Sequence, residues 1–130
     1  MTGTDRQDNR ALVDRYLTAY IAFDVAGMCA LLDPEVVFEN YSDDVLTAAT
    51  KGVEAFRRLA EDSAALFATR AQKLVSLRLE ADRAIAVIDF EGVLARDIEG
   101  GPAAGSVIAL TGKSEFEFRG GAITRIIDRS

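Results

Sequence analysis

The sequence contains no histidine and a single cysteine, Cys29, and these two shortages narrow the chemistry available to the protein. Histidine is the commonest metal ligand and the side chain that most often moves protons near neutral pH. Its absence excludes Ser-His-Asp and Cys-His catalytic pairs and His-carboxylate iron sites, and a structural zinc site is excluded with them. One cysteine cannot form an internal disulfide, and Cys29 reads as a small core residue. We therefore expect neither a metal nor a cofactor, which leaves carboxylates, tyrosines, lysines and amides.

Long apolar runs and basic stripes are also missing. No stretch approaches the roughly 20 apolar residues that span a bilayer, so we expect no membrane partner. The polar residues 1–8 read as a disordered lead-in rather than a signal peptide, which favours a cytoplasmic protein. The net charge of −6 repels phosphate groups, so we expect no nucleic acid partner.

The remaining residues, 9–130, are expected to form one domain, because a chain of 130 residues is too short for two. Apolar residues at helical spacing predict a first helix near residues 9–23; they are Leu12, Val13, Tyr16, Leu17, Tyr20 and Ile21. Asp24 is placed to cap a short second helix, and Asp33-Pro34 ends it.

A strand over residues 35–40 follows, in which Val36, Phe38 and Asn40 share one face. Residues 41–51 are polar and small and predict an irregular connection, and a third helix runs from Gly52 to near Thr69. Period-two patterns from Gln72 onward then predict four antiparallel strands joined by turns, with the longest at residues 84–98 and 106–118. Three helices on one strongly curved mixed β-sheet make an α+β cone, in which the long strands bend around a cavity.

The order and spacing of five segments identify a resemblance. They are Arg15-Tyr16, Phe23-Asp24, Leu31 to Asn40, Gly52 to Phe56 and Phe118 to Ile123. In this pattern the chain resembles the SnoaL-like or nuclear transport factor 2-like superfamily, which includes ketosteroid isomerases. The resemblance implies a cone-shaped, cystatin-like α+β fold over nearly the whole chain. The superfamily contains isomerases, dehydratases, cyclases, hydrolases and plain binding modules, so membership does not by itself assign a reaction.

Compared with ketosteroid isomerases, Tyr16 lies where that family keeps a phenol that donates a hydrogen bond to the developing oxyanion. The alternative is a core tyrosine on the apolar face of its helix. Asn40 lies where the family carries the aspartate that moves the proton, and an amide cannot do that. Ser114 falls near the third family position, the acid of the oxyanion hole, although a one-residue register slip would put Lys113 there.

The resemblance therefore implies a ligand pocket without the usual base. Its expected polar contacts are Tyr16, Asn40 and Ser114, and its expected aromatic walls are Tyr20, Phe38, Phe56, Phe116 and Phe118.

Acids elsewhere offer a second possibility. Asp89 and Glu91 share one face of a strand, and on a concave face they would act as an acid and a base. On the opposite face they would be solvated or would face a second subunit. Asp128 and Arg125 fall on opposite faces of the last strand by parity, which weakens a pair between them.

Two functions remain open. The first is binding of a small apolar or carbonyl-bearing metabolite in the cone, with chemistry if an acid lies near Tyr16. The second is a non-catalytic dimeric interaction or accessory module whose cone is filled by its own phenylalanines. Apolar residues on both faces of the long strands also predict a homodimer through the sheet.

Overall fold

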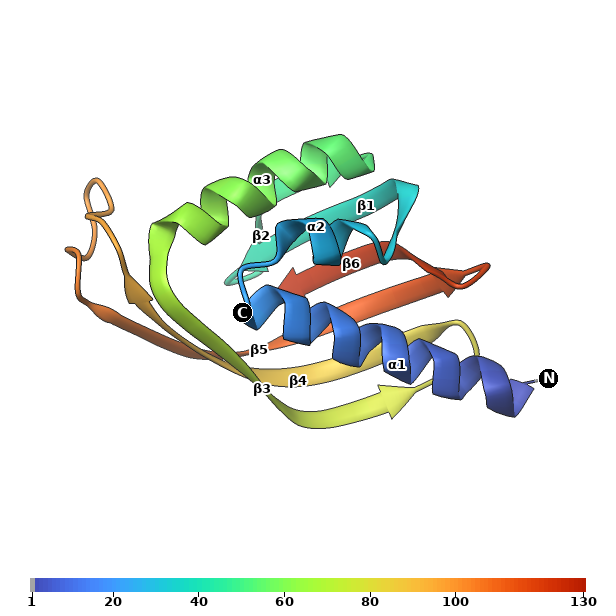
Figure 1. Cartoon of the computed structure of the whole chain (residues 1–130). Coiled ribbons are helices and arrows are strands. Elements are labelled where there is room, and N and C mark those ends of the chain that lie inside the picture. Colours follow the sequence, from blue (N-terminus) through green and yellow to red (C-terminus); the bar gives the residue numbers. More distant parts are fainter. Residues whose placement is uncertain (1) are drawn as a thin grey trace.

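The computed structural model describes residues 2–130, with side chains from residue 8 onward. Three helices cover one face of a six-stranded sheet whose strand order is β2-β1-β6-β5-β4-β3 (Figure 1). The helices are α1 (Thr2–Ile21), α2 (Val25–Cys29) and α3 (Val53–Leu66). The strands are β1 (Leu32–Ser42), β2 (Val45–Lys51), β3 (Phe67–Leu79), β4 (Arg83–Leu94), β5 (Val107–Arg119) and β6 (Ala122–Arg129). This arrangement confirms the α+β fold with a curved mixed sheet.

Helix α1 begins at Thr2, well before the start expected near residue 9, so residues 2–8 of the expected lead-in are helical and Met1 lies outside the described residues. Extending a formed helix fixes one residue per added hydrogen bond, which lets a polar segment continue it. The helix ends at Ile21, and Phe23 in the turn that follows has a φ of +58°. The Phe23 amide donates to the Tyr20 carbonyl and the Asp24 amide to the Ala19 carbonyl. A residue in the left-handed conformation therefore closes the helix C-terminus, a position usually taken by glycine.

The irregular connection expected over residues 41–51 is wrong. Asp43 and Asp44 form a tight turn with positive φ, and residues 45–51 form strand β2, which pairs antiparallel with β1. Strand β2 is the edge of the sheet and most of its side chains are exposed, so it needs no alternation of apolar and polar residues.

Strand β1 runs parallel to β6, and every other pair in the sheet is antiparallel. The register shifts after Asn40 in β1, after Leu74 in β3 and after Glu117 in β5. Such irregularities bend a strand and increase its twist, which lets the sheet curl around the helices.

The core lies between the helices and the concave face of the sheet, which we call the inner face. Strand β4 shows how alternation selects this face, because Ala84, Ala86 and Ile88 are buried whereas Asp89 and Glu91 are exposed. Phe116 on β5 and Ile126 on β6 are completely buried in the same core. The convex outer face carries the residues of opposite parity.

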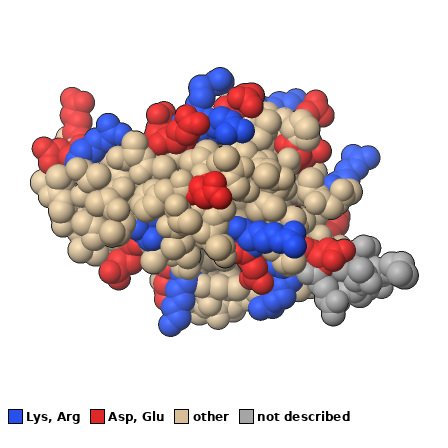
Figure 2. Space-filling model, in the orientation of Figure 1, with Lys and Arg blue, Asp and Glu red and all other residues tan. Residues whose placement is uncertain are grey.

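Charges of both signs are interspersed over the face shown in Figure 2. Within residues 2–130, no helix is both long enough and apolar enough to cross a membrane.

Candidate functional site

Three polar residues lie side by side across the inner face of the sheet. Asn40 of β1 pairs with Asp128 of β6, and Asp128 pairs in turn with Ser114 of β5. Two positions along the same strands, Phe38, Ile126 and Phe116 are paired in the same way. All three side chains are buried, so this row points into the core. Alternation along each strand therefore turns Asn40, Asp128 and Ser114 toward the interior of the cone.

Asp128 is the titratable group at the centre of this row. The Ser114 hydroxyl donates a hydrogen bond of 2.6 Å to its Oδ1. Burial raises the pKa of the Asp128 carboxyl from 3.8 to about 6, and the hydrogen bond from Ser114 opposes this rise. A carboxyl with a pKa near 6 exchanges protons readily close to neutral pH, which is what a general base or acid requires.

Tyr16 of α1 reaches the same space from the helical side. Its ring packs edge-on against Phe116 with centroids 5.6 Å apart, and only 6% of the residue is exposed. Burial raises the pKa of the Tyr16 phenol well above its usual value, and the nearby charge of Asp128 adds to this rise. Its hydroxyl makes no hydrogen bond within residues 8–130, so this donor is available to a bound molecule.

These groups border a hollow of about 290 Å³, which we call the inner cavity. Its lining residues come from the helices, β1, β2 and β6: Tyr16, Tyr20, Met28, Phe38, Asn40, Ala48, Phe56, Leu59, Ala60, Ser63 and Asp128. A second hollow of about 550 Å³, which we call the mouth, shares Tyr20, Asn40 and Asp128 with it and extends past Ser114 toward the end of the chain. Asp128 therefore faces both hollows.

The structure brings most of the expected pocket residues together. Tyr16, Tyr20, Phe38, Asn40 and Phe56 line the inner cavity, and Ser114 lines the mouth. Phe116 and Phe118 instead stack in the core, with ring centroids 6.4 Å apart, and do not line either hollow. Ser114 is buried whereas Lys113 is exposed, so the register that turns the serine inward is the one adopted.

The Asn40 amide is held from one side. Its Nδ2 donates a 2.7 Å hydrogen bond to the Thr47 hydroxyl, which itself donates to the Asn40 carbonyl oxygen. The other end of the amide has no partner within residues 8–130 and borders the inner cavity. Asn40 can therefore contact a ligand through a fixed polar atom.

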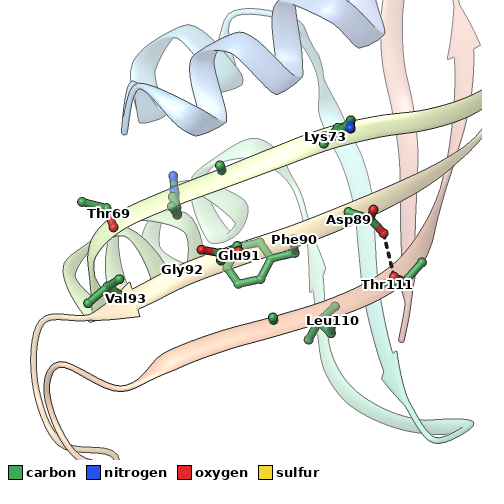
Figure 3. Close-up of a pocket in the computed structure, with 12 residues that line it drawn as sticks. Thr69, Lys73, Asp89, Phe90, Glu91, Gly92, Val93, Leu110 and Thr111 are labelled. Carbon is green, nitrogen blue, oxygen red and sulfur yellow. Dashed lines mark hydrogen bonds between the residues drawn. The ribbon is translucent and has the colours of Figure 1, made fainter.

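Asp89 and Glu91 do not form an acid and base pair inside the cone. Both are exposed on the outer face, where the Thr111 hydroxyl donates a 2.6 Å hydrogen bond to Asp89 (Figure 3). They border a shallow hollow of about 700 Å³ that is larger than the inner cavity. We place the functional site in the smaller hollow, because only there do buried polar groups converge.

Asp128 was missed as a site residue, although the sequence contains the signal. It lies two positions after the buried Ile126, so strand alternation turns it toward the same face. From the sequence, Asp128 was considered only as a possible partner of Arg125. Arg125 lies on the opposite face of the strand, where it forms a 2.9 Å ion pair with Glu39. Among the described residues, no three Asp, Glu or Cys side chains are grouped to hold a metal ion.

Solved structures with similar folds cover nearly the whole chain. A candidate polyketide cyclase from Xanthomonas campestris is 24% identical over 97% of this chain and 92% of its own, with a TM-score of 0.80. A candidate polyketide cyclase from a Silicibacter species is 25% identical over 94% of this chain and 88% of its own, with a TM-score of 0.76. A protein of ketosteroid isomerase-like fold from Catenulispora acidiphila is 14% identical over 90% and 82%, with a TM-score of 0.73.

No curated protein matches the chain. The family model described as a SnoaL-like domain matches residues 13–126, which include α2, α3 and nearly all of the sheet. The chain therefore belongs to the SnoaL-like domain family.

Proposed function

We propose that this SnoaL-like domain binds a small apolar or carbonyl-bearing metabolite in the inner cavity and moves a proton on it, with Asp128 as the base. One observation carries the proposal: a carboxyl with a pKa of about 6 borders the same cavity as an unpartnered phenol. A base and a hydrogen-bond donor in one dry pocket are what proton abstraction next to a carbonyl requires.

In the proposed step, the ionised Asp128 carboxylate takes a proton from the carbon next to the ligand carbonyl. The electron pair of the broken C–H bond moves to the carbonyl oxygen, which becomes an enolate. The Tyr16 hydroxyl donates a hydrogen bond to this oxygen, and the Asn40 amide holds another polar group of the ligand. Transfer of the proton from Asp128 to a different carbon of a conjugated enolate completes an isomerisation. Alternatively, the enolate carbon attacks a second carbonyl, whose oxygen takes the proton from Asp128 to become a hydroxyl, and this completes a cyclisation.

The base in this proposal lies one strand away from its place in ketosteroid isomerases. Asn40 occupies the family's base position on β1, and its Cα partner on β6 is Asp128. Because paired residues on neighbouring strands project side by side, a base on β6 reaches the same cavity from a shifted position. We infer that the resemblance to ketosteroid isomerases extends to the kind of chemistry but not to the residue that performs it.

The ligand class follows from the lining and from one relative. Most lining residues of the inner cavity are apolar or aromatic, with few polar atoms among them. The 25% identical Silicibacter structure is described as a candidate polyketide cyclase, and polyketides carry several carbonyl groups. We propose a carbonyl-rich aromatic or alicyclic metabolite as the ligand.

Hydrogen exchange of a model ketone tests the proposal. The α-protons of 2-tetralone are followed by NMR in deuterated water with the wild-type protein and with Asp128→Asn. The wild type is expected to accelerate exchange, and Asp128→Asn to lose about 100-fold or more of that acceleration. Asp62→Asn, the same change on the exposed surface of α3, is the control and is expected to behave as the wild type. Equal exchange in wild type and Asp128→Asn would overturn the assignment of the base.

The pH dependence of the same reaction gives a second test. The base form of Asp128 forms as pH rises through about 6, so the exchange rate is expected to rise with a midpoint there. A rate that does not change across this range would exclude Asp128 as the base.

The alternative of a filled, non-catalytic cone receives less support. Phe116 and Phe118 pack in the core below the site and leave a hollow of about 290 Å³ bordered by Phe38 and Phe56. A cone closed by its own phenylalanines would not keep that space.

We also propose that the protein forms a homodimer through the outer face of the sheet. Val75 and Val107 are exposed by 54% and 59%. Lys73 and Asp89 lie on paired positions of β3 and β4, so the same patch carries both charge signs. A second copy, turned by a two-fold axis, would place apolar area on apolar area and opposite charges together.

A further inference from the structure

Three aromatic side chains in mutual contact line one side of the mouth. Phe67 at the start of β3 packs edge-on against Phe90 of β4, with ring centroids 5.4 Å apart. Phe90 in turn packs edge-on against Tyr20 of α1, with centroids 6.5 Å apart. All three residues line the mouth and are only partly buried. We call this row the aromatic wall.

Both ends of the aromatic wall are held in place by neighbouring residues. The guanidinium carbon of Arg70 lies 3.7 Å above the centre of the Tyr20 ring, and its Nε donates a 2.8 Å hydrogen bond to the Tyr20 carbonyl. At the other end, a Cβ added to Gly92 of β4 would lie 2.7 Å from Cδ1 of Phe67 and 3.0 Å from Cζ of Phe90. A glycine at this position therefore leaves the space in which the Phe67 ring lies. Such support fixes the rings in one arrangement, as a binding surface requires.

The aromatic wall leads from the mouth to the proposed base. Tyr16 lines the inner cavity but not the mouth, whereas Tyr20 and Asp128 line both hollows. Phe90 and Phe67 line the mouth but not the inner cavity. A ligand whose carbonyl oxygen contacts Tyr16, with the neighbouring carbon at Asp128, therefore has its remaining atoms at the boundary with the mouth. The inner cavity of about 290 Å³ is small for a whole metabolite, so the rest of a longer ligand extends into the mouth.

Packing of the core does not require this arrangement. Phe116 shows what a core aromatic does in this fold, since its ring is completely buried between the helices and the sheet. Phe67 and Phe90 instead keep part of their surface toward a hollow. Apolar surface in contact with water lowers stability, and a bound apolar molecule removes that contact.

We propose that the aromatic wall is a subsite that selects ligands by their length, because it binds a flat ring distant from the reacting carbonyl. The inference rests on the proposed function, which places the carbonyl end in the inner cavity. Aromatic rings pair favourably in edge-to-face and offset-stacked arrangements, and the wall offers a further ring both geometries. The ligand is then an elongated, flat ketone whose reacting end lies at Asp128 and whose far ring lies on Phe67 and Phe90.

Two ketones of different length test the subsite: 2-tetralone and its linear benzo-fused homologue, which has one more aromatic ring. Both have a benzylic carbon next to the carbonyl, so their α-protons have similar acidity, and exchange in buffer alone corrects for the remaining difference. Exchange is followed by NMR in deuterated water at about pH 7.5, where Asp128 is ionised. The wild type is expected to show a kcat/KM about tenfold higher for the longer ketone. The gain should appear mainly as a lower KM, because the added ring does not react.

The variants Phe67→Leu and Gly92→Ala change the aromatic wall in different ways. Phe67→Leu removes a ring, whereas Gly92→Ala keeps every ring and displaces that of Phe67. Both are expected to lower the preference for the longer ketone to about threefold or less. Phe56→Leu is the control, because it makes the same change in the inner cavity and should slow both ketones while keeping their ratio. The ratio within one variant does not depend on how much of the protein is folded, and if Gly92→Ala does not fold, Phe67→Leu decides.

Equal kcat/KM for the two ketones in the wild type would overturn the subsite, and so would a preference that survives unchanged in Phe67→Leu. If 2-tetralone shows exchange that depends on Asp128 and the longer ketone gains nothing, only the subsite fails. Exchange of neither ketone by the wild type would overturn the proposed function and the subsite with it.

Discussion

Two aspartates on opposite faces of one sheet differ in what they can do. Asp128 on the inner face and Asp89 on the outer face each accept a 2.6 Å hydrogen bond from a hydroxyl on β5, Ser114 for the first and Thr111 for the second. Asp89 is exposed to water, whereas burial raises the pKa of Asp128 to about 6. The same residue with the same kind of hydrogen bond thus becomes a candidate base only on the face that the helices cover.

The largest expected difference between the two faces is in the loss of unfolding free energy when a side chain is truncated. Phe116 is completely buried, so Phe116→Ala is expected to lower the free energy of unfolding by about 3–5 kcal/mol. Val107 is 59% exposed, so Val107→Ala is expected to change the free energy of unfolding of each chain by less than about 0.5 kcal/mol. Urea denaturation measures both changes, and similar losses would mean that the outer face is as well covered as the core.

Asp128→Asn is expected to stabilise the protein. The pKa of Asp128 is higher in the folded chain than the usual 3.8, so the folded state holds the proton more tightly and loses stability as pH rises from about 4 to 6. At pH 7 this cost is about 3 kcal/mol in the wild type, and an uncharged amide avoids it. Asp89→Asn on the outer face is the control.

Unfolding free energies measured between pH 4 and pH 7 check this prediction. The stability of Asp128→Asn should exceed that of the wild type at pH 7 and approach it near pH 4. A variant that is less stable than the wild type at pH 7 would contradict the burial of this carboxylate.

A smaller change should follow from removing the hydroxyl that faces Asp128. In Ser114→Ala the carboxylate loses its hydrogen-bond donor, so the pKa of Asp128 is expected to rise further, by about one pH unit. Titration of the carboxyl ¹³C resonance by NMR measures it. Thr111→Ala makes the matching change beside Asp89 and should leave the Asp128 resonance unaffected. An unchanged Asp128 titration in Ser114→Ala would show that the serine does not act on the carboxylate.

A charge placed on the outer face should change the oligomeric state of the protein rather than the folding of each chain. Val107→Asp places a charge on the exposed patch and is expected to leave the fold of each chain intact while separating the proposed dimer. Sedimentation should then show a particle near 14.0 kDa for the variant and twice that mass for the wild type. A wild type that sediments near 14.0 kDa would remove the dimer proposal.

The sequence predicts the fold well where hydrophobic periodicity is strong. Alternation in β4 and β5 and the helical stripe of α1 are enforced by a buried face, so the pattern is written in residue types. Strand β2 was missed because an exposed edge strand is specified by its pairing with β1 rather than by apolar residues of its own. Strand alternation turns Asp128 inward just as it turns Asn40 and Ser114 inward. Its place between them, however, depends on the pairing of β6 with β1 and β5.

By itself, the sequence determined the class of the fold, the inward direction of Tyr16 and Asn40, and the exclusion of histidine chemistry. These depend on composition and on the fixed periods of helix and strand. Only the tertiary structure decided that β1 and β6 pair in parallel, which sets Asp128 between Asn40 and Ser114. It also decided that Ser114 rather than Lys113 points inward. Both results depend on which strands become neighbours and in which register, and these follow from packing between segments far apart in the chain.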